Sequence, residues 1–109
     1  MKILLDENID IRFKKYFVEL HEVYTVQDMK WNGIKNGELL RLIKGHNFNC
    51  WIVVDKNIPY QQNVSRLPCL LIVLDVFRNT LKHLIQLLPQ IHEVLQHEYT
   101  EKVLIIQEK

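Results

Sequence analysis

Three short apolar runs, each ending on an aspartate, constrain the fold more than any other feature of the chain. The runs are "KILLD", "CWIVVD" and "CLLIVLD", which end at Asp6, Asp55 and Asp75. Each has the length of a strand and is almost continuously apolar, which is typical of parallel strands buried on both faces. None approaches the roughly 20 apolar residues that a membrane-spanning helix needs, so no membrane association is expected. The runs therefore predict a buried parallel sheet whose strands end on acidic residues.

Strand and helix patterns alternate along the chain. Strand patterns cover 2–5, 21–26, 50–55, 69–75 and 102–107, and helical patterns cover 9–20, 36–45 and 78–99. Asn8 is the expected cap of the first helix, and Pro89 predicts that the last helix kinks or divides into two. The loop 56–68 is expected to hold one helical turn.

This alternation predicts an α/β fold, a three-layer sandwich with a mostly parallel sheet of about five strands. The length of 109 residues suits a single domain spanning 1-109. The last strand is expected to be an antiparallel strand at the edge of the sheet.

The charge balance argues against a general nucleic-acid-binding domain. The chain carries 14 basic and 13 acidic residues, a net charge of +1, whereas a general nucleic-acid-binding domain is strongly basic. The N-terminus lacks the features of a secretory signal, so a cytoplasmic location is expected. Cys50 and Cys69 have no Cys or His partner at zinc-binding spacing and are expected to be buried thiols.

The aspartates at the strand ends indicate a ligand site. In an open α/β sheet, ligands bind beyond the carboxyl ends of the strands, where Asp6, Asp55 and Asp75 are all expected. Neighbouring carboxylates raise one another's pKa, and Mg²⁺ or Mn²⁺ would remove the repulsion. The alternative is that Asp6 and Asp55 only cap the turns that follow their strands, which is a common role for aspartate.

Three segments, "KILLDENI", "NGELLRLI" and "IVVDKNIPY", together resemble small bacterial PIN-like domains in this order, and the resemblance covers essentially the whole chain. It implies a PIN-like fold and a metal-dependent ribonuclease that hydrolyses RNA with Mg²⁺ or Mn²⁺. Many small PIN domains are VapC-like toxins of bacterial toxin–antitoxin pairs. The resemblance therefore also implies a cognate antitoxin protein as partner, and a homodimer formed through helix surface.

When the family motifs are matched residue by residue, the resemblance implies a site that keeps two acids of the family and lacks two others. Asp6 and Asp55 match two acids of the family, whereas Asn36 and Asn57 stand where the family has acids, and Glu38 is placed to compensate. The resemblance implies catalytic and metal-binding roles for Asp6, Glu38 and Asp55, and substrate-binding roles for Asn8, Asn36, Asn57, Lys56 and Tyr60. Glu7, Asp28 and Trp31 are further candidates.

Two alternatives to a nuclease stay open. The two asparagines also favour a catalytically weakened PIN-like scaffold that binds RNA or a protein partner without turnover. A phosphoacceptor domain of the response-regulator type gathers aspartates at strand ends too, but it needs a lysine after the fifth strand and a further helix, and this chain reads "IIQEK" there. For Trp31 and Tyr60, packing in the fold is the alternative to stacking on RNA bases.

Overall fold

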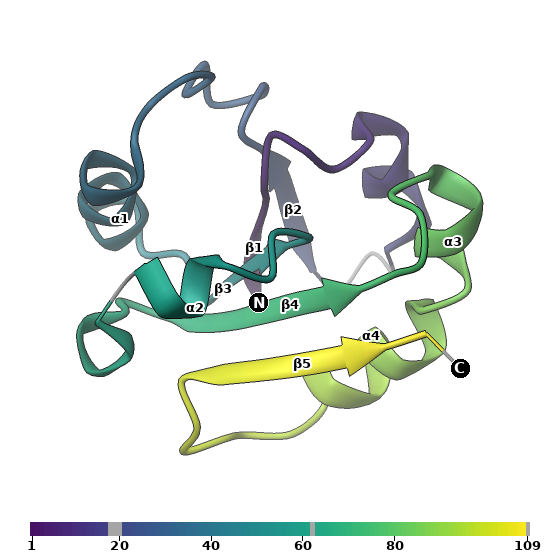
Figure 1. Ribbon diagram of the computed structural model, residues 1–109. Helices are drawn as coiled ribbons and strands as arrows, with labels where there is room; N and C mark the ends of the chain where they lie inside the picture. The colour runs from purple at the N-terminus through teal and green to yellow at the C-terminus, as the bar shows by residue number, and fades with distance from the viewer. Residues whose placement is uncertain (18–20, 62, 109) are drawn as a thin grey trace.

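A five-stranded, all-parallel sheet forms the centre of the protein in the computed structural model, which describes residues 1–17, 21–61 and 63–108 (Figure 1). The strand order is β2-β1-β3-β4-β5. The bounds are β1 Lys2–Leu5, β2 Glu22–Thr25, β3 Cys50–Val53, β4 Leu70–Asp75 and β5 Val103–Gln107. The expected α/β fold is confirmed.

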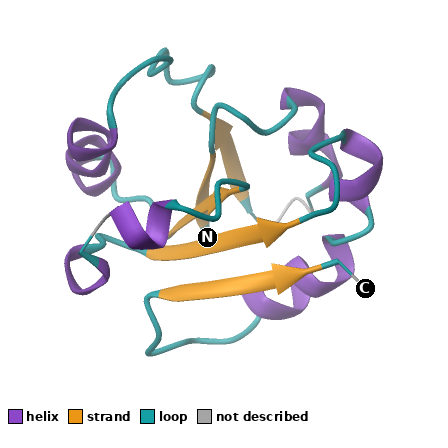
Figure 2. Cartoon of the chain, viewed as in Figure 1, coloured by secondary structure: helices purple, strands orange, loops and turns teal. Residues whose placement is uncertain are grey.

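Helical segments cover both faces of this sheet (Figure 2). They are η1 Ile11–Tyr16, α1 Asn36–Gly45, α2 Ile58–Gln61, η2 Val64–Arg66, α3 Leu81–Ile85 and α4 Leu88–Leu95. Side chains of η1, α3 and α4 pack on one face, and side chains of α1 and α2 pack on the other. Among the described residues, no helix has the length and apolar character that crossing a membrane requires.

The orientation of β5 differs from the expectation. β5 pairs with β4 in parallel, with Leu71 opposite Val103 and Asp75 opposite Gln107, so the prediction of an antiparallel edge strand was wrong. The reason lies in the connection, because α3 and α4 carry the chain back to the end of the sheet at which β4 began. A helical crossover of this kind joins parallel strands.

The first helical segment is shorter than the sequence predicts. η1 is a 3₁₀ helix, and its cap is Asp10, whose carboxylate accepts a hydrogen bond of 2.9 Å from the Arg12 backbone N–H. The prediction of Asn8 as the cap was therefore wrong. Phe17 has an extended backbone and ends the helix, and residues 18–20 of the predicted helix lie outside the described residues.

The last helical segment divides into two, as the sequence allows. The Thr80 side chain caps α3 by accepting a hydrogen bond from the His83 backbone N–H, and Pro89 lies at the start of α4. Proline suits this position because the first turn of a helix has no partner for its N–H groups.

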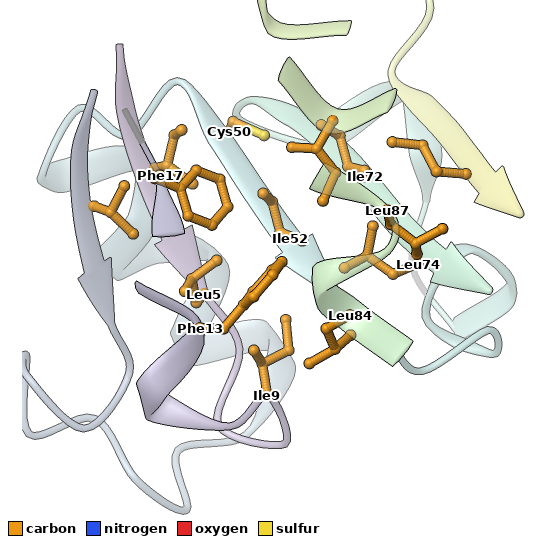
Figure 3. Close-up of a cluster of buried hydrophobic side chains, with 14 of the residues drawn as sticks. Leu5, Ile9, Phe13, Phe17, Cys50, Ile52, Ile72, Leu74, Leu84 and Leu87 are labelled. Atoms are coloured by element: carbon orange, nitrogen blue, oxygen red, sulfur yellow. The ribbon is translucent and has the colours of Figure 1, made fainter. Parts of the chain in front are cut away.

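Two apolar clusters, one on each face of the sheet, hold the layers together. The first joins Ile3 and Leu5 of β1 to Phe13 of η1 and to Leu84 of α3 (Figure 3). The second packs α1 and the segment around Trp31 against the other face. Cys50 and Cys69 are both buried, as expected, and burial raises the pKa of the Cys69 thiol to about 12.

Candidate functional site

The direction of chain crossovers reverses between β1 and β3. From β1 the chain passes to β2 on one side, and β3, β4 and β5 then follow on the other side. In open α/β sheets, the crevice beyond the carboxyl ends of the strands at such a reversal is the usual ligand site. Asp6 directly follows β1, and Asp55 lies two residues after the end of β3. The topology therefore brings these two predicted residues to one place.

Asp6 is the buried acid of this site, with only 6% of its surface exposed. Its backbone N–H donates to the Ile52 carbonyl oxygen at 3.0 Å, which fixes it beside β3. Burial, and then the charges of Glu7 and Asp55, raise the pKa of the Asp6 carboxyl to about 6. The Glu7 backbone N–H acts in the opposite direction. Within the described part of the chain, no basic side chain forms an ion pair with the Asp6 carboxylate.

A buried aromatic residue, Trp51, lies on the same face of the sheet as Asp6. It lies on β3 opposite Leu4, and Asp6 follows Leu4 by two positions, so the two side chains share a face of the sheet. The indole ring is buried, and its Nε1 forms no hydrogen bond with the described residues. Burial of the carboxyl is the main cause of its raised pKa.

Asp55 has a turn-capping role as well as a place in the site. One of its carboxylate oxygens accepts a hydrogen bond of 2.9 Å from the Asn57 backbone N–H, and its carbonyl oxygen accepts one from Ile58 at the start of α2. The turn holds the carboxylate at the strand end, where its charge acts on Asp6. The expected capping role is therefore present, and the charge of Asp55 also acts on Asp6.

The third strand-end aspartate is neutralised by the chain itself. Lys56 Nζ lies 2.6 Å from a carboxylate oxygen of Asp75, at the end of β4. The pair borders an open pocket of about 170 Å³, which is lined by Lys56, Pro59, Val73, Asp75, Ile105 and Gln107. Lys56, a predicted substrate-binding residue, thus lies toward β4.

Two further candidate acids have structural partners. Glu7 accepts a hydrogen bond of 3.2 Å from the backbone N–H of Gly33, whose φ of 76° lies in the region that favours glycine. Asp28 accepts from the Thr25 backbone N–H at 2.9 Å and pairs with Lys14 at 2.8 Å. Glu7 therefore holds the loop after β2, while Asp28 fixes the turn that leads into this loop.

Two further candidates, Glu38 and Trp31, have partners elsewhere in the described structure. Glu38 pairs with Arg41 on the exposed side of α1, and Trp31 is buried edge-on against His46 and Phe48. The side chains of Asn36 and Tyr60 lie outside the described part of the chain. Across residues 1–17, 21–61 and 63–108, no three His, Cys, Asp or Glu side chains form a group that could hold one metal ion.

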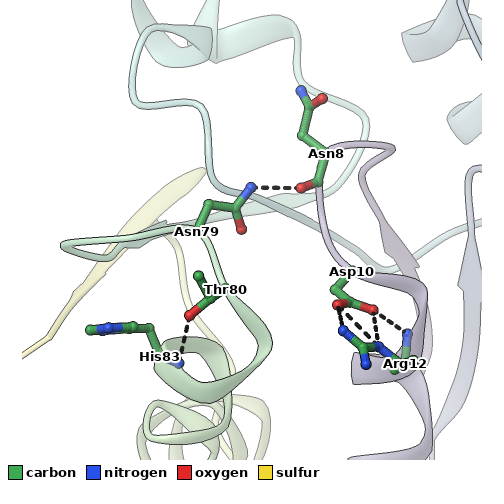
Figure 4. Close-up of polar contacts among 6 residues, drawn as sticks. All are labelled: Asn8, Asp10, Arg12, Asn79, Thr80 and His83. Carbon is green, nitrogen blue, oxygen red and sulfur yellow. Dashed lines mark hydrogen bonds and ion pairs between the residues drawn. The ribbon is translucent and has the colours of Figure 1, made fainter.

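One exposed loop at this edge was missed in the sequence analysis. Phe77 is 76% exposed, the largest exposure among the large hydrophobic side chains described, and Arg78 beside it is also exposed. Asn79 ties this loop to the segment after Asp6 by donating a hydrogen bond of 2.7 Å from Nδ2 to the Asn8 carbonyl oxygen (Figure 4). The available signal was an aromatic and a basic residue that follow, after Val76, a strand ending on aspartate.

Comparisons of the chain with protein-family models, with curated proteins and with solved structures found no match.

Proposed function

We propose that the protein is a metal-dependent ribonuclease whose centre is the Asp6 carboxylate. The observation that carries the proposal is a buried acid at the reversal of the sheet, with its pKa raised to about 6 and two further carboxylates acting on it. Strongly shifted acids in a ligand crevice are typical of functional sites. A carboxylate kept in such surroundings at neutral pH favours a cation as its partner.

Mg²⁺ or Mn²⁺ suits the donor set, because Asp6 and Asp55 offer hard oxygen ligands and such ions keep several bound waters. Bound there, the ion would supply a water of lowered pKa and stabilise the charge that develops on a phosphate. Asp6 and Asp55 would hold it. Asn57 and Asn8, exposed beside these two acids, would orient waters or phosphate oxygens. With Glu38 paired to Arg41, we propose one ion rather than two.

Single-stranded RNA is the proposed substrate class, and the loop Phe77–Asn79 is its proposed binding element. An exposed aromatic ring next to a guanidinium can stack on a splayed base and contact a phosphate. The hydrogen bond from Asn79 to the Asn8 carbonyl oxygen, two residues after Asp6, supports this choice of binding element. The PIN-like segments also support a toxin role, with an antitoxin protein that covers this edge.

A phosphoacceptor domain is the second candidate, because the strand order β2-β1-β3-β4-β5 is also that of response-regulator domains. The residues at the end of β5 distinguish the two functions. Phosphoacceptor chemistry needs a lysine there, and this strand ends on Gln107, followed by Glu108, which binds His83 at 2.7 Å. The nuclease therefore remains the function that the geometry supports best.

RNA cleavage tests the proposal. The protein is incubated with single-stranded RNA in Mn²⁺, Mg²⁺ or EDTA, beside Asp6→Asn, Asp55→Asn and the matched variant Asp28→Asn. We expect cleavage that requires metal, with losses of at least about 100-fold in the first two variants, because each removes a ligand charge. Asp28→Asn should keep its activity, since Asp28 binds Lys14 and Thr25 instead.

Other outcomes separate the alternatives. RNA binding without cleavage would favour the weakened scaffold that binds without turnover. Equal cleavage by the protein and all three variants would trace the activity to a contaminating nuclease and remove the support for Asp6.

Replacing Phe77 by alanine should weaken RNA binding. Base stacking on an aromatic side chain contributes about 1–3 kcal/mol per base, so we expect the dissociation constant for a short single-stranded RNA to rise roughly 5-fold to 100-fold. Fluorescence anisotropy on catalytically inactive Asp6→Asn protein measures it without cleavage. Tyr16→Ala, which removes another exposed aromatic ring on η1, is the control, and an equal effect there would argue against the Phe77 loop.

A further inference from the structure

The free edge of β5 presents a regular row of unpaired backbone groups. In the described sheet, β5 has one neighbour, β4. Leu71 N–H donates to the Lys102 carbonyl oxygen, and Glu108 N–H donates to the Asp75 carbonyl oxygen. These two bonds fix the alternation of the strand, so the even-numbered residues face β4. The N–H and C=O groups of the odd-numbered residues, Val103, Ile105 and Gln107, point away from the sheet.

The side chains of β5 lack the features that protect an open sheet edge from pairing with another strand. The strand reads "VLIIQ", with no charged residue and no proline, and Ile105 is 59% exposed. Natural sheets protect open edges with charges, proline or bulges. The opposite edge strand, β2, follows this rule, since it begins with Glu22 and its Tyr24 ring lies beneath Lys2 and Lys14. An unprotected, strongly β-forming edge of this kind can pair with a further strand.

We propose that a second copy of this chain covers this edge, by antiparallel pairing of β5 with the partner's β5 about a two-fold axis at Ile105. Residues directly opposite in such a ladder exchange two hydrogen bonds where their backbone groups face each other. The outward-facing residues fit this register throughout. Ile105 lies opposite the partner's Ile105, and Val103 lies opposite the partner's Gln107.

Apolar side chains lie opposite one another in the same register. The exposed Ile105 side chain packs against the partner's Ile105 on one face of the joined sheet, and Leu104 lies opposite the partner's Ile106 on the other. An arbitrary partner strand would not be expected to match these positions, which is why a second copy is the occupant we choose.

The proposed dimer leaves the Asp6 site open. Because the two β5 strands run in opposite directions, the carboxyl edges of the two sheets point in opposite directions. The proposed dimer can therefore be confirmed or excluded independently of the proposed RNA cleavage.

Cysteine cross-linking tests the register. Ile105→Cys should form a disulfide-linked dimer on mild oxidation, since directly opposite residues have Cα atoms about 5.5 Å apart, within reach of a disulfide. Gln107→Cys alone should not, because the Cα atoms of the two equivalent residues would lie about 14 Å apart. A mixture of Val103→Cys and Gln107→Cys proteins should cross-link with each other. The wild-type protein, whose two thiols are buried, is the blank.

The oligomeric state of the protein in solution tests the β5–β5 contact without a cross-linking reaction. By analytical ultracentrifugation across micromolar concentrations, we expect a monomer–dimer equilibrium for the wild-type protein and monomer alone for Ile105→Lys. Phe77→Lys, which places the same charge on an even more exposed apolar position off the edge, should still dimerise. Circular dichroism checks that both variants fold. A wild-type protein that stays monomeric, a dimer that survives Ile105→Lys, or equal cross-linking at 105 and 107 would each overturn the proposal.

Discussion

The Asp6→Asn variant is expected to be more stable than the wild-type protein at neutral pH, although we expect it to be inactive. The pKa of the Asp6 carboxyl is about 6 in the folded protein, against 3.8 in the unfolded chain. Between these values the folded state binds more protons, so wild-type stability should fall as pH rises from about 4 to about 6. The shift corresponds to about 3 kcal/mol at neutral pH, and a neutral amide of similar shape should recover much of it.

Thermal and urea unfolding between about pH 4 and pH 8 measure this effect. The difference between the Asp6→Asn and wild-type proteins should grow with pH and then level off. Added Mg²⁺ should narrow it at high pH by stabilising only the wild-type protein. Asp10→Ala is a control of opposite sign, because Arg12 holds the pKa of Asp10 at about 2 and this acid therefore stabilises the fold when ionised. Parallel pH profiles for the wild-type and Asp6→Asn proteins would contradict the account of Asp6.

Among the substitutions proposed for this protein, replacing Phe13 by alanine should cause the largest loss of folding stability. Phe13 is fully buried, and its ring meets that of Phe17 edge to face at 5.2 Å between centroids. It lies in the cluster that joins η1 to Leu5, Ile52 and Leu84 (Figure 3). Truncations of this kind cost about 3–5 kcal/mol, a large share of the roughly 5–15 kcal/mol that a domain has. A 3₁₀ helix of one or two turns has little stability of its own, so its place on the sheet depends on this side chain.

Tyr16→Ala is the matched control, since Tyr16 lies in the same helix but is 38% exposed. Its loss should change the unfolding free energy by no more than about 0.5 kcal/mol. Urea midpoints with unchanged m-values measure both variants. Equal effects of the two substitutions would mean that η1 does not depend on the buried ring.

The fold was largely predictable because its strands have a strong signal. Near-continuous apolar runs identify the central strands, and the helical stretch after β4 was expected to break at Pro89. The parallel direction of β5 was also available from the sequence, because a helical connection returns the chain to the end where the previous strand began. The length of η1 was not, since apolar spacing at Ile9, Phe13 and Phe17 is compatible with helix and with a short 3₁₀ turn followed by extended chain.

Only those site residues whose position follows from the backbone topology were predictable from the sequence. Asp6 and Asp55 reach one edge because parallel strands end there. Glu38 could not be placed, because Arg41, one turn further along the exposed face of α1, competes for its carboxylate. Phe77 was missed because exposure of an apolar residue leaves no mark in sequence periodicity, and the hydrogen bond from Asn79 to Asn8 joins positions 71 residues apart.

The strand order also determines how the sheet can grow during synthesis. β1 is made first and takes its place with β2 on one side and β3 on the other, after which β4 and β5 each add to the outermost strand. No strand has to enter between two strands that are already paired. A chain leaving the ribosome can therefore extend the sheet outward in the order of translation, and each newly made strand finds its template already formed.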